Sequence, residues 1–230
     1  EGACASSALA FREGVLAIAS GMYDVVLVGG FEQMSKCSTA EVAEGLAMAA
    51  SPYEVAAGFT FPGVFGTMAT AYFDRYGATR ETLFNVTIKS HQNAPLNPKA
   101  QFPMTVKDFM NNRIEKARKN GDPVPEWEDE KDYLADPTAN PSVAWPLHLF
   151  DCCPISDGAA CLLLVAEDIA RNFTDTPIHV AGIGQGSGYS LHAKVDLTSY
   201  EATRAAGHEA YKMSGLAPDD IQFAEVHDCF

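Results

Sequence analysis

The sequence predicts an α/β fold in which buried strands alternate with helices, and three observations support this prediction. Uninterrupted apolar runs at 25–28 and 159–165 are typical of strands covered on both faces, as in a parallel sheet. The stretch 5–20 is apolar nearly all round and is followed by Gly21, so we expect a helix that is buried on most sides. Further helices are expected in the polar region that separates the two runs.

The middle of the chain differs from its surroundings because glycine, proline, asparagine and charged residues interrupt it. We expect helices at 64–76, 79–94 and 105–119, the second of them opened by Thr79 as its N-cap. Residues 121–146 are acidic and rich in proline, and they show no clear period. This last segment is therefore expected to form a long loop.

The end of the chain predicts two more strands, at 178–182 and 223–226. Between them, residues 198–201 have the spacing of a capping box and should open a helix that runs to about Ser214, with Gly215 as its stop. Strands that alternate with helices along the chain imply a layered α/β architecture.

The composition excludes several classes of protein. Of the 230 residues, 47% are hydrophobic and 20% are charged, an ordinary globular profile that fits one large domain or two smaller ones. The net charge of −14 argues against nucleic-acid binding, which needs a basic surface. No apolar run approaches the roughly 18 residues that cross a bilayer. No basic segment followed by an apolar one opens the chain, so no signal peptide is expected.

The six cysteines include no Cys-x-x-Cys pair, so we expect no metal site. The adjacent Cys152 and Cys153 do not resemble a disulfide framework. This points to a reducing, intracellular compartment, namely the cytoplasm, or the peroxisome in a eukaryote. In such a compartment a cysteine is most often a small buried hydrophobe.

Cys4 is the cysteine that best fits a catalytic role. It stands immediately before the predicted helix at 5–20, whose N-terminus offers unpaired N–H groups and a partial positive charge. Both favour the thiolate, which is the nucleophilic form of cysteine. The neighbouring alanines and serines are small and leave room for a thioester. The alternative is an inert, buried cysteine.

His227 is the second candidate, because it follows the last predicted strand, at a sheet edge where α/β proteins place their sites. Its imidazole could hold a water molecule or polarise a thioester carbonyl. A structural histidine is the alternative, and Asp228 beside it could cap a helix.

Three other segments leave their roles open. The glycine-rich stretch 182–188 lacks the spacing of a dinucleotide-binding fingerprint, so we interpret it as a close-packed turn. Ser156 or Asp157 could bind a ligand, or the Asp157-Gly158 pair could set the backbone of a turn before the second strand. The only basic cluster could contact phosphates or be a solvated helix face. It comprises Lys107, Arg113, Lys116, Arg118 and Lys119.

Taken together, four motifs resemble the thiolase family. Residues 2–7 (Gly-Ala-Cys-Ala-Ser-Ser) are similar to its nucleophile motif, and residues 25–35 to the strand and Gly-Gly-x-Glu-x-Met-Ser segment that follow. Residues 154–160 are similar to the turn into the next core strand. Residues 227–230 (His-Asp-Cys-Phe) stand where many thiolases have Asn-Glu-Ala-Phe, and resemble the sterol-carrier-protein-type thiolases and their archaeal and bacterial relatives.

The resemblance implies a layered α-β-α-β-α fold of two similar halves, with a loop domain inserted in the first. The present chain would supply part of it. Residues 1–35 and 151–167 would belong to the first half, 36–150 to the loop domain, and 168–230 to the start of the second half.

The same resemblance implies an acyl-CoA:acetyl-CoA C-acyltransferase with no bound cofactor and with coenzyme A thioesters as substrates. Cys4 would take an acyl group from a 3-ketoacyl-CoA and release acetyl-CoA, and a second CoA would collect the acyl group. The reverse reaction is a Claisen condensation. His227 would position the catalytic water and help to form an oxyanion hole. The substrate-binding candidates are Phe61, Arg113, Lys116, Cys153 and Ser156.

The family also implies two kinds of protein partner. A homodimer or larger oligomer would form through the strand at 25–28. The His-Asp-x-Phe form resembles thiolases found with a small zinc-ribbon and OB-fold protein that helps to hold coenzyme A. The acidic balance of the chain fits a protein that takes basic contacts from elsewhere.

Two departures from the family pattern leave other functions open. The Gly-His-Pro histidine that activates the nucleophile and the late Cys-x-Gly cysteine are absent, so we expect no thiolase activity from residues 1–230 alone. One alternative is a noncatalytic thiolase-like subunit of a complex. Another is a related ketoacyl or hydroxymethylglutaryl-CoA synthase, although the Gly-Gly-Phe-Glu-Gln-Met-Ser segment favours a thiolase.

Overall fold

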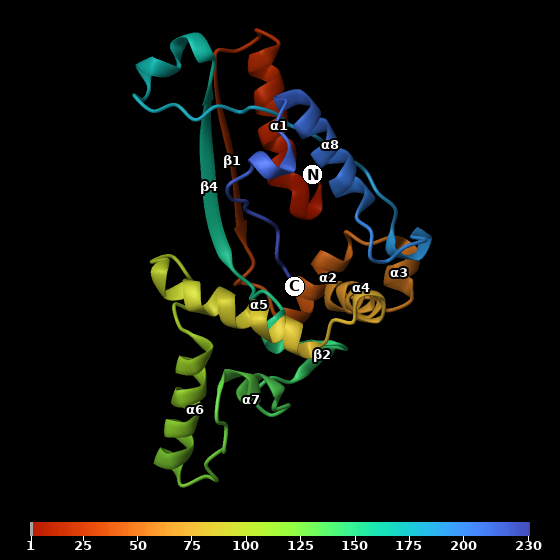
Figure 1. Cartoon of the computed structure of the whole chain (residues 1–230), viewed down its shortest axis with the longest axis vertical. Coiled ribbons are helices and arrows are strands. Elements are labelled where there is room, and N and C mark those ends of the chain that lie inside the picture. The colour runs from red at the N-terminus through yellow and green to blue at the C-terminus, as the bar shows by residue number, and fades with distance from the viewer. Residues whose placement is uncertain (1) are drawn as a thin grey trace. The chain divides into compact units, whose positions relative to one another are not determined.

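Two units make up the computed structural model, which describes residues 2–230 (Figure 1). Unit 1 comprises the residues up to Gly58 together with Ile155–Lys194 and Ser199–Val226. Unit 2 comprises Phe59–Pro154, to which the short segments Val195–Thr198 and His227–Phe230 belong. Each unit therefore contains segments that are distant in the sequence.

The sheet of unit 1 has two long strands, β1 (Val25–Gln33) and β4 (Asp157–Val165). They pair antiparallel over their full length, from Val25 opposite Val165 to Gln33 opposite Asp157. The expectation of a parallel sheet is wrong for these strands. The chain leaves the sheet at Gln33 and returns to it at Asp157, next to the point of departure, so the second strand must run back along the first.

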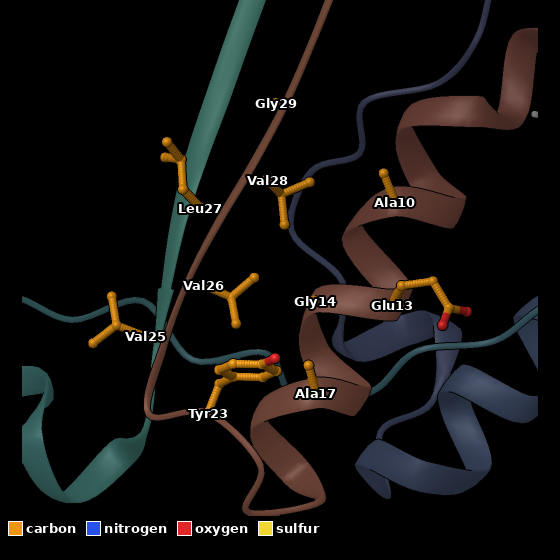
Figure 2. A pocket seen from close by; sticks show the side chains of 10 residues that line it. All are labelled: Ala10, Glu13, Gly14, Ala17, Tyr23, Val25, Val26, Leu27, Val28 and Gly29. Carbon is orange, nitrogen blue, oxygen red and sulfur yellow. The ribbon is translucent and has the colours of Figure 1, made fainter.

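One face of this sheet packs against α1 (Ser6–Ala19), and Gly14 makes the close approach possible. A Cβ atom at Gly14 would lie 2.7 Å from Val28 Cγ2 and 2.8 Å from Leu164 Cδ1. Figure 2 shows Val26 and Val28 on the side of the strand that faces α1, with Leu27 on the other side. Successive side chains of β1 therefore point alternately toward α1 and away from it, and only one face of the strand is covered, whereas the sequence predicted burial on both faces.

Burial of these elements is much lower than the sequence predicts. Gly14 is the buried residue of α1, and the helix is otherwise partly or fully exposed. On the sheet face away from α1, Leu27 and Phe31 are 69% and 87% exposed. The predicted burial of the helix and of both strands is wrong in this chain, because each apolar element has a neighbour on one side only.

Unit 1 also holds two helices that the sequence did not predict. They are α2 (Thr39–Ala47) and α3 (Pro52–Ala56), and a serine caps each of them. Ser38 and Ser51 accept from the backbone N–H groups of Glu41 and Glu54, and each glutamate bonds back, which completes a capping box. Short 3₁₀ turns lie later in the unit: η4 (Glu167–Asn172), η5 (Leu191–Ala193) and η6 (Pro218–Asp220).

The last helix, α8 (Glu201–Ser214), ends at Gly215 in a left-handed conformation, as predicted. Its N-cap is Tyr200, which makes no side-chain capping bond, so the predicted capping box is wrong. The stretch 182–188 packs closely on this helix: a Cβ atom at Gly184 would lie 1.9 Å from Ala206 O. The predicted close packing is confirmed, but the segment is irregular chain and not the expected turn.

Two predicted strands are not formed. Neither 178–182 nor 223–226 is a strand in the structure, although both segments are rich in apolar residues. Ile178 and Phe223 are 97% and 85% exposed. Since an isolated extended segment has no ladder of hydrogen bonds, the pattern alone does not make these residues strands.

The three helices predicted in the middle of the chain are confirmed in unit 2. They are α4 (Phe61–Tyr76), α5 (Arg80–Asn93) with Thr79 at its N-cap, and α6 (Val106–Asn120). The expected loop at 121–146 contains more structure than predicted. It contains α7 (Glu130–Ala135) and β2 (Ser142–Ala144), and β2 pairs with β3 (Leu147–His148), which follows it. Two 3₁₀ turns complete the unit, η2 (Ala94–Leu96) and η3 (Leu149–Asp151).

Unit 2 is built around a hydrophobic core between α5, α6 and α7. Leu134 of α7 is fully buried, and Val106 of α6 is 1% exposed. An aromatic set packs around them with mostly edge-to-face geometry. The buried residues of the cluster are Phe84, Val106, Met110, Tyr133, Leu134 and Ala139.

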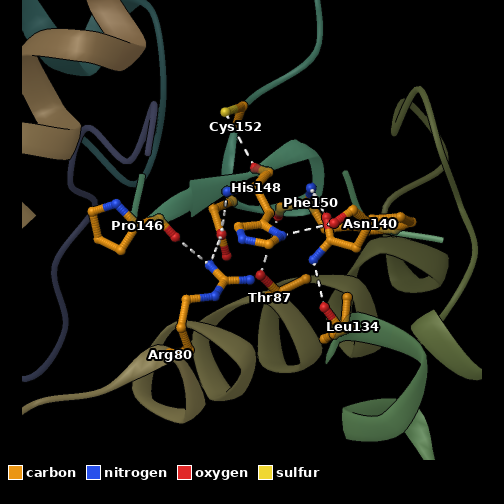
Figure 3. Close-up of polar contacts among 9 residues, drawn as sticks. Arg80, Thr87, Leu134, Asn140, Pro146, His148, Phe150 and Cys152 are labelled. Atoms are coloured by element: carbon orange, nitrogen blue, oxygen red, sulfur yellow. Dashed lines mark hydrogen bonds and ion pairs between the residues drawn. The ribbon is translucent and has the colours of Figure 1, made fainter. Parts of the chain in front are cut away.

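A network of polar contacts links residues 140–152 to α5 and α7 (Figure 3). Asn140 is fully buried: its Nδ2 donates to Leu134 O at 2.8 Å, and its Oδ1 accepts from Phe150 N at 2.9 Å. Arg80 forms an ion pair with the buried Asp151. The hydrogen bonds of the buried Asn140 and Asp151 side chains hold residues 134–151 together in this unit.

Candidate active site

Cys4 lies in a single 3₁₀ turn, η1 (Ala3–Ala5), directly before α1. Its side chain is exposed and is not in a disulfide. Ala5, the N-cap of α1, has no side-chain oxygen to bind the N–H groups of the first turn. The structure thus confirms that Cys4 precedes a helix, and at such a position a negative charge is favoured.

The turn that carries Cys4 has an unusual backbone conformation. Ala3 has a φ angle of 48°, in the left-handed region that residues with a Cβ atom rarely adopt. Such a residue costs on the order of 1–3 kcal/mol and persists where its surroundings hold it. Here Gly2 N–H donates to Ser6 Oγ at 2.9 Å, and Ala5 N–H donates to Gly2 O at 2.9 Å. The strained turn therefore presents Cys4 outward at the helix start.

A shallow hollow of about 540 Å³ lies beside α1 (Figure 2), and Cys4 is not one of the residues that line it. Its walls are apolar apart from Glu13 and Tyr23. Ala10 is the lining residue nearest to Cys4 in the sequence, and it lies more than one helical turn further along. The other lining residues are Gly14, Ala17, Val25, Val26, Leu27, Val28 and Gly29.

Asp157 joins the ends of β1 and β4. Its Oδ1 accepts from the N–H groups of Met34 and Ser35, both at 2.8 Å, and its Oδ2 accepts from Ser35 Oγ at 2.5 Å. The Ser35 hydroxyl and backbone lower the pKa of Asp157. The Asp-Gly turn left open for this segment is not formed, because Asp157 and Gly158 begin β4 and pair with Gln33 and Glu32 of β1. The hydrogen bonds of its carboxylate give Asp157 a structural role at the ends of the two strands. Ser156 beside it is exposed.

The segment His227–Phe230 belongs to unit 2, and two contacts hold it there. Cys153 N–H donates to Cys229 O at 3.0 Å, and the Phe230 ring stacks on Phe65 of α4 at a centroid distance of 4.7 Å. His227 itself is exposed.

Phe61 stacks in turn on Phe65, with ring centroids 6.3 Å apart. Two predicted substrate-binding residues therefore lie near the segment that carries His227. Phe61 reaches it through Phe65, which stacks on Phe230. Cys153 reaches it through its hydrogen bond to Cys229. Phe65 was missed in the sequence, although the spacing of Phe61 and Phe65 on one helix face could have indicated it.

Arg113 and Lys116 lie on α6, where the two side chains have different surroundings. Arg113 Nη2 donates to Thr138 O at 2.7 Å, so this side chain supports the loop after α7. Lys116 lines a shallow surface hollow of about 580 Å³. The other residues of that hollow are Asn112, Glu115, Arg118 and Lys119.

Cys4 and Ser156 belong to unit 1, whereas Phe61, Arg113, Lys116, Cys153 and His227 belong to unit 2. Among residues 2–230, no group of three or more histidine, cysteine, aspartate or glutamate side chains could hold a metal ion. No helix in the same range is long and apolar enough to cross a membrane.

One polar cluster of unit 1 went unnoticed in the sequence. The carboxylate of Glu54, which is 5% exposed, accepts from His192 N at 2.8 Å and contacts His192 Nδ1 at 2.9 Å. These contacts join α3 to the turn η5, and the separation of the two residues in the sequence gives no signal for them.

Comparison with protein families identifies the chain by two matches in sequence order. A model described as the thiolase N-terminal domain matches residues 1–168, and a model described as thiolase C-terminal domain-like matches residues 184–230. The first match covers Cys4 and both long strands, and the second covers α8 and His227.

Relatives with similar sequences include two archaeal enzymes. The acetyl-CoA acetyltransferase of Methanothermobacter thermautotrophicus is 40% identical over 234 residues, and that of Methanocaldococcus jannaschii is 38% identical over 233. The benzoylsuccinyl-CoA thiolase subunit BbsB of Thauera aromatica is 29% identical. The matches to all three cover 100% of this chain but 53% of the relative, so the chain spans about half the length of these relatives.

Among solved structures, the Ltp2-ChsH2(DUF35) aldolase matches 94% of this chain and 51% of that chain, with a TM-score of 0.67 and 26% identity. A monomeric SCP2-thiolase-like protein from Mycobacterium smegmatis matches 97% of this chain and 43% of that chain, with a TM-score of 0.58 and 19% identity. The second similarity bears on the fold alone. The predicted thiolase-like α/β fold is confirmed.

Proposed function

The chain belongs to the thiolase family, and we propose that it carries the acyl-accepting cysteine and the oxyanion-binding histidine of an acyl-CoA:acetyl-CoA C-acyltransferase. The observation that most strongly supports this proposal is the position of Cys4. It is an exposed thiol on a strained turn, directly before a helix that lacks a side-chain cap. Two relatives that are 40% and 38% identical are acetyl-CoA acetyltransferases.

In the thiolytic direction, the thiolate of Cys4 attacks the C3 carbonyl of a 3-ketoacyl-CoA. The C2–C3 bond breaks, the electron pair leaves with C2, and protonation of C2 gives acetyl-CoA. The thiolate of a second CoA then attacks the acyl group on Cys4, which restores the cysteine. Condensation is the reverse. The attacking thiolates supply the electron pairs of the new C–S bonds and the C2–C3 pair leaves with C2, so the proposed reaction has no redox step.

His227 has the role of a hydrogen-bond donor in this proposal. Negative charge develops on the C3 oxygen when Cys4 attacks the ketone, and on the thioester oxygen when CoA attacks the acyl group on Cys4. A fixed donor lowers the energy of such a state. Its placement in unit 2 with Phe61 and Cys153 supports a shared function for these residues.

We assign the substrate contacts by their chemistry. Phe61 offers an apolar surface to the pantetheine or acyl part, and Cys153 and Ser156 offer polar groups. Lys116 suits the phosphates of CoA because its hollow also contains Arg118 and Lys119. Arg113 fits that role less well, since its Nη2 already donates a hydrogen bond to Thr138 O.

We also propose two kinds of protein partner, a second copy of this chain and a different protein. The exposed apolar face of β1, with Leu27 and Phe31, supports dimerisation or higher assembly through this strand. A zinc-ribbon and OB-fold partner that helps to hold coenzyme A is also part of the proposal. The similarity to the Ltp2-ChsH2(DUF35) aldolase, which is named for two components, supports assembly with a second protein. The location in the cytoplasm stays a prediction.

A noncatalytic thiolase-like subunit is the second candidate. One relative, 29% identical, is described as a subunit of benzoylsuccinyl-CoA thiolase, which favours function within a complex of different chains. The two candidates differ in the reactivity of Cys4, which a noncatalytic subunit does not need.

Alkylation of the folded protein tests the assignment of the nucleophile. After brief treatment with iodoacetamide, peptide mapping should find Cys4 labelled well before Cys37 and Cys161. Those two are also exposed, so they are matched controls. Cys37 likewise precedes an N-cap, but Ser38 and Glu41 close that helix start with a capping box, and Cys161 lies within β4. Burial raises the pKa of Cys152 to about 11, and this thiol should react last. Labelling of Cys37 or Cys161 with Cys4 untouched would sink the assignment.

Substitution of His227 tests the oxyanion role in the intact protein from the native source. His227→Ala should lower kcat by about 100-fold or more, the typical loss for one such donor. His208→Ala, which removes an exposed histidine from α8, is the control and should leave kcat unchanged. An unchanged kcat in a well-folded His227→Ala variant refutes the role.

A further inference from the structure

Three cysteines that are separated in the sequence meet in unit 2. Cys152 and Cys153 follow η3, and Cys229 lies in the segment that Phe230 anchors on Phe65. None of the three is in a disulfide. Cys153 N–H donates to Cys229 O, which brings the segment of Cys229 beside the adjacent pair Cys152 and Cys153.

The backbone contact between Cys153 and Cys229 sets the distance between their α-carbons. Cys153 N–H donates to Cys229 O at 3.0 Å. With standard bond lengths, a hydrogen bond of this length keeps the two α-carbons within about 7 Å of each other. Disulfides join residues whose α-carbons are about 4.4–6.8 Å apart, so this pair is within reach of a bond without a large backbone movement.

Cys152 is less suited to the same reaction. Its Sγ donates to His148 O at 3.4 Å, and it is partly buried, whereas the side chain of Cys153 is exposed. Burial raises the pKa of Cys152 to about 11, so little thiolate is present at neutral pH. Geometry and reactivity therefore both favour Cys153 as the thiol that meets an oxidant first.

We propose that Cys153 and Cys229 form a reversible disulfide, and that this pair is an oxidation site that couples the end of η3 to the segment carrying His227. The partner molecule is a low-molecular-weight disulfide. This inference concerns the pair of thiols and does not depend on the proposed acyl transfer.

The reaction balances in two exchanges. The thiolate of Cys153 attacks one sulfur of the small disulfide, a mixed disulfide forms, and one small thiolate leaves. The thiolate of Cys229 then attacks the Cys153 sulfur of the mixed disulfide and displaces the second small thiolate. Two protein thiols are oxidised, one small disulfide is reduced to two thiols, and the two protons pass to solvent or to the released thiolates.

The bond would restrain the segment that contains His227. Cys229 is two residues after His227, so a covalent link to Cys153 limits the positions that the histidine can take. In the reduced protein the non-covalent contacts of this segment include the backbone hydrogen bond from Cys153 to Cys229 and the Phe230–Phe65 stack. Oxidation adds a covalent link to these contacts.

Disulfide mapping of the folded, full chain tests the proposal. The protein is treated with oxidised glutathione, remaining thiols are alkylated after denaturation, and the digest is analysed by mass spectrometry with and without reduction. We expect a reducible link between the peptides that contain Cys153 and Cys229. The link should persist in Cys152→Ala and disappear in Cys153→Ala. In Cys229→Ala, Cys153 should remain as the mixed disulfide with glutathione.

Three outcomes would overturn the proposal. The first is a link from Cys229 that persists in Cys153→Ala and disappears in Cys152→Ala. The second is a bond between the adjacent Cys152 and Cys153. The third is a wild-type chain that keeps glutathione on Cys153 without any link to Cys229. Because Cys152→Ala and Cys153→Ala replace adjacent residues, circular dichroism of both variants before oxidation checks that each is folded.

Discussion

Unit 2 and unit 1 bury their apolar side chains to different degrees, although both are rich in them. In unit 2, Leu134 and Val106 are at most 1% exposed and lie in a core shared by three helices. In unit 1, Leu27 and Phe31 occupy the middle of a regular strand and are 69% and 87% exposed. Strand formation and burial are therefore separate outcomes: pairing requires one neighbour in the sheet, and burial requires covering elements on the faces.

The difference also bears on function. The candidate nucleophile belongs to the less covered unit, on a turn that precedes α1, while His227 is held by the better packed unit. Since the core of unit 2 is formed by α5, α6 and α7, substitutions in this core should lower stability more than substitutions at the exposed positions of β1.

Removal of the core side chain of unit 2 should have the largest effect. Leu134→Ala leaves a cavity in a fully buried position and should lower the free energy of unfolding by about 2–5 kcal/mol. The matched substitution in unit 1, Leu27→Ala, removes an exposed side chain and should cost at most about 0.5 kcal/mol. Urea denaturation of both variants measures this. Equal losses would contradict the comparison.

A substitution at the interface of α1 with the sheet should have an intermediate effect. The added Cβ atom of Gly14→Ala would clash with Val28 and Leu164 and should cost about 1–3 kcal/mol. Gly45→Ala in α2 is the control, because its Cβ atom would meet nothing within 4 Å and helix propensity improves by about 1 kcal/mol. Thermal unfolding distinguishes them. A neutral Gly14→Ala would show that the packing of α1 on the sheet is loose.

The smallest effect should come from the carboxylate that joins β1 to β4. Hydrogen bonds from Ser35 and Met34 lower the pKa of Asp157 below its ordinary value of 3.8. A carboxyl with a lowered folded-state pKa adds stability above its unfolded pKa, and this stability is lost as the pH falls through the folded value. Hydrogen exchange at the Met34 and Ser35 amides should therefore accelerate below about pH 4 relative to the trend at higher pH. Asp157→Asn should remove that acceleration, and persistence of the same pH dependence in this variant would contradict the assignment.

Local signals in the sequence predicted the elements whose formation depends on nearby residues. Thr79 at the start of α5 and Gly215 at the end of α8 are both as predicted, because capping depends on residues within one turn. The helix before which Cys4 stands was predicted from the same kind of signal. What failed depends on distant residues. The direction of β4 follows from the chain returning beside Gln33, and the exposure of Leu27 follows from the lack of a covering element.

The candidate site shows the same division. Motif residues such as Cys4 and His227 were recognised in the sequence, whereas the contacts that place them are partly long-range. The stack of Phe230 on Phe65 and the hydrogen bond from Cys153 to Cys229 join residues far apart in the chain, and neither residue pair has a periodic pattern that could indicate it.

Trapping of an acyl-enzyme tests the central claim, that Cys4 accepts the acyl group, most directly. The folded protein is incubated with acetyl-CoA and no second substrate, quenched with acid and digested, and the peptides are mapped by mass spectrometry. We predict one acetyl group on Cys4, lost on addition of free CoA and absent in Cys4→Ala, with Cys37 and Cys161 unmodified. A wild-type protein that binds acetyl-CoA but carries no acetyl group on Cys4, or carries it on another cysteine, would contradict the claim.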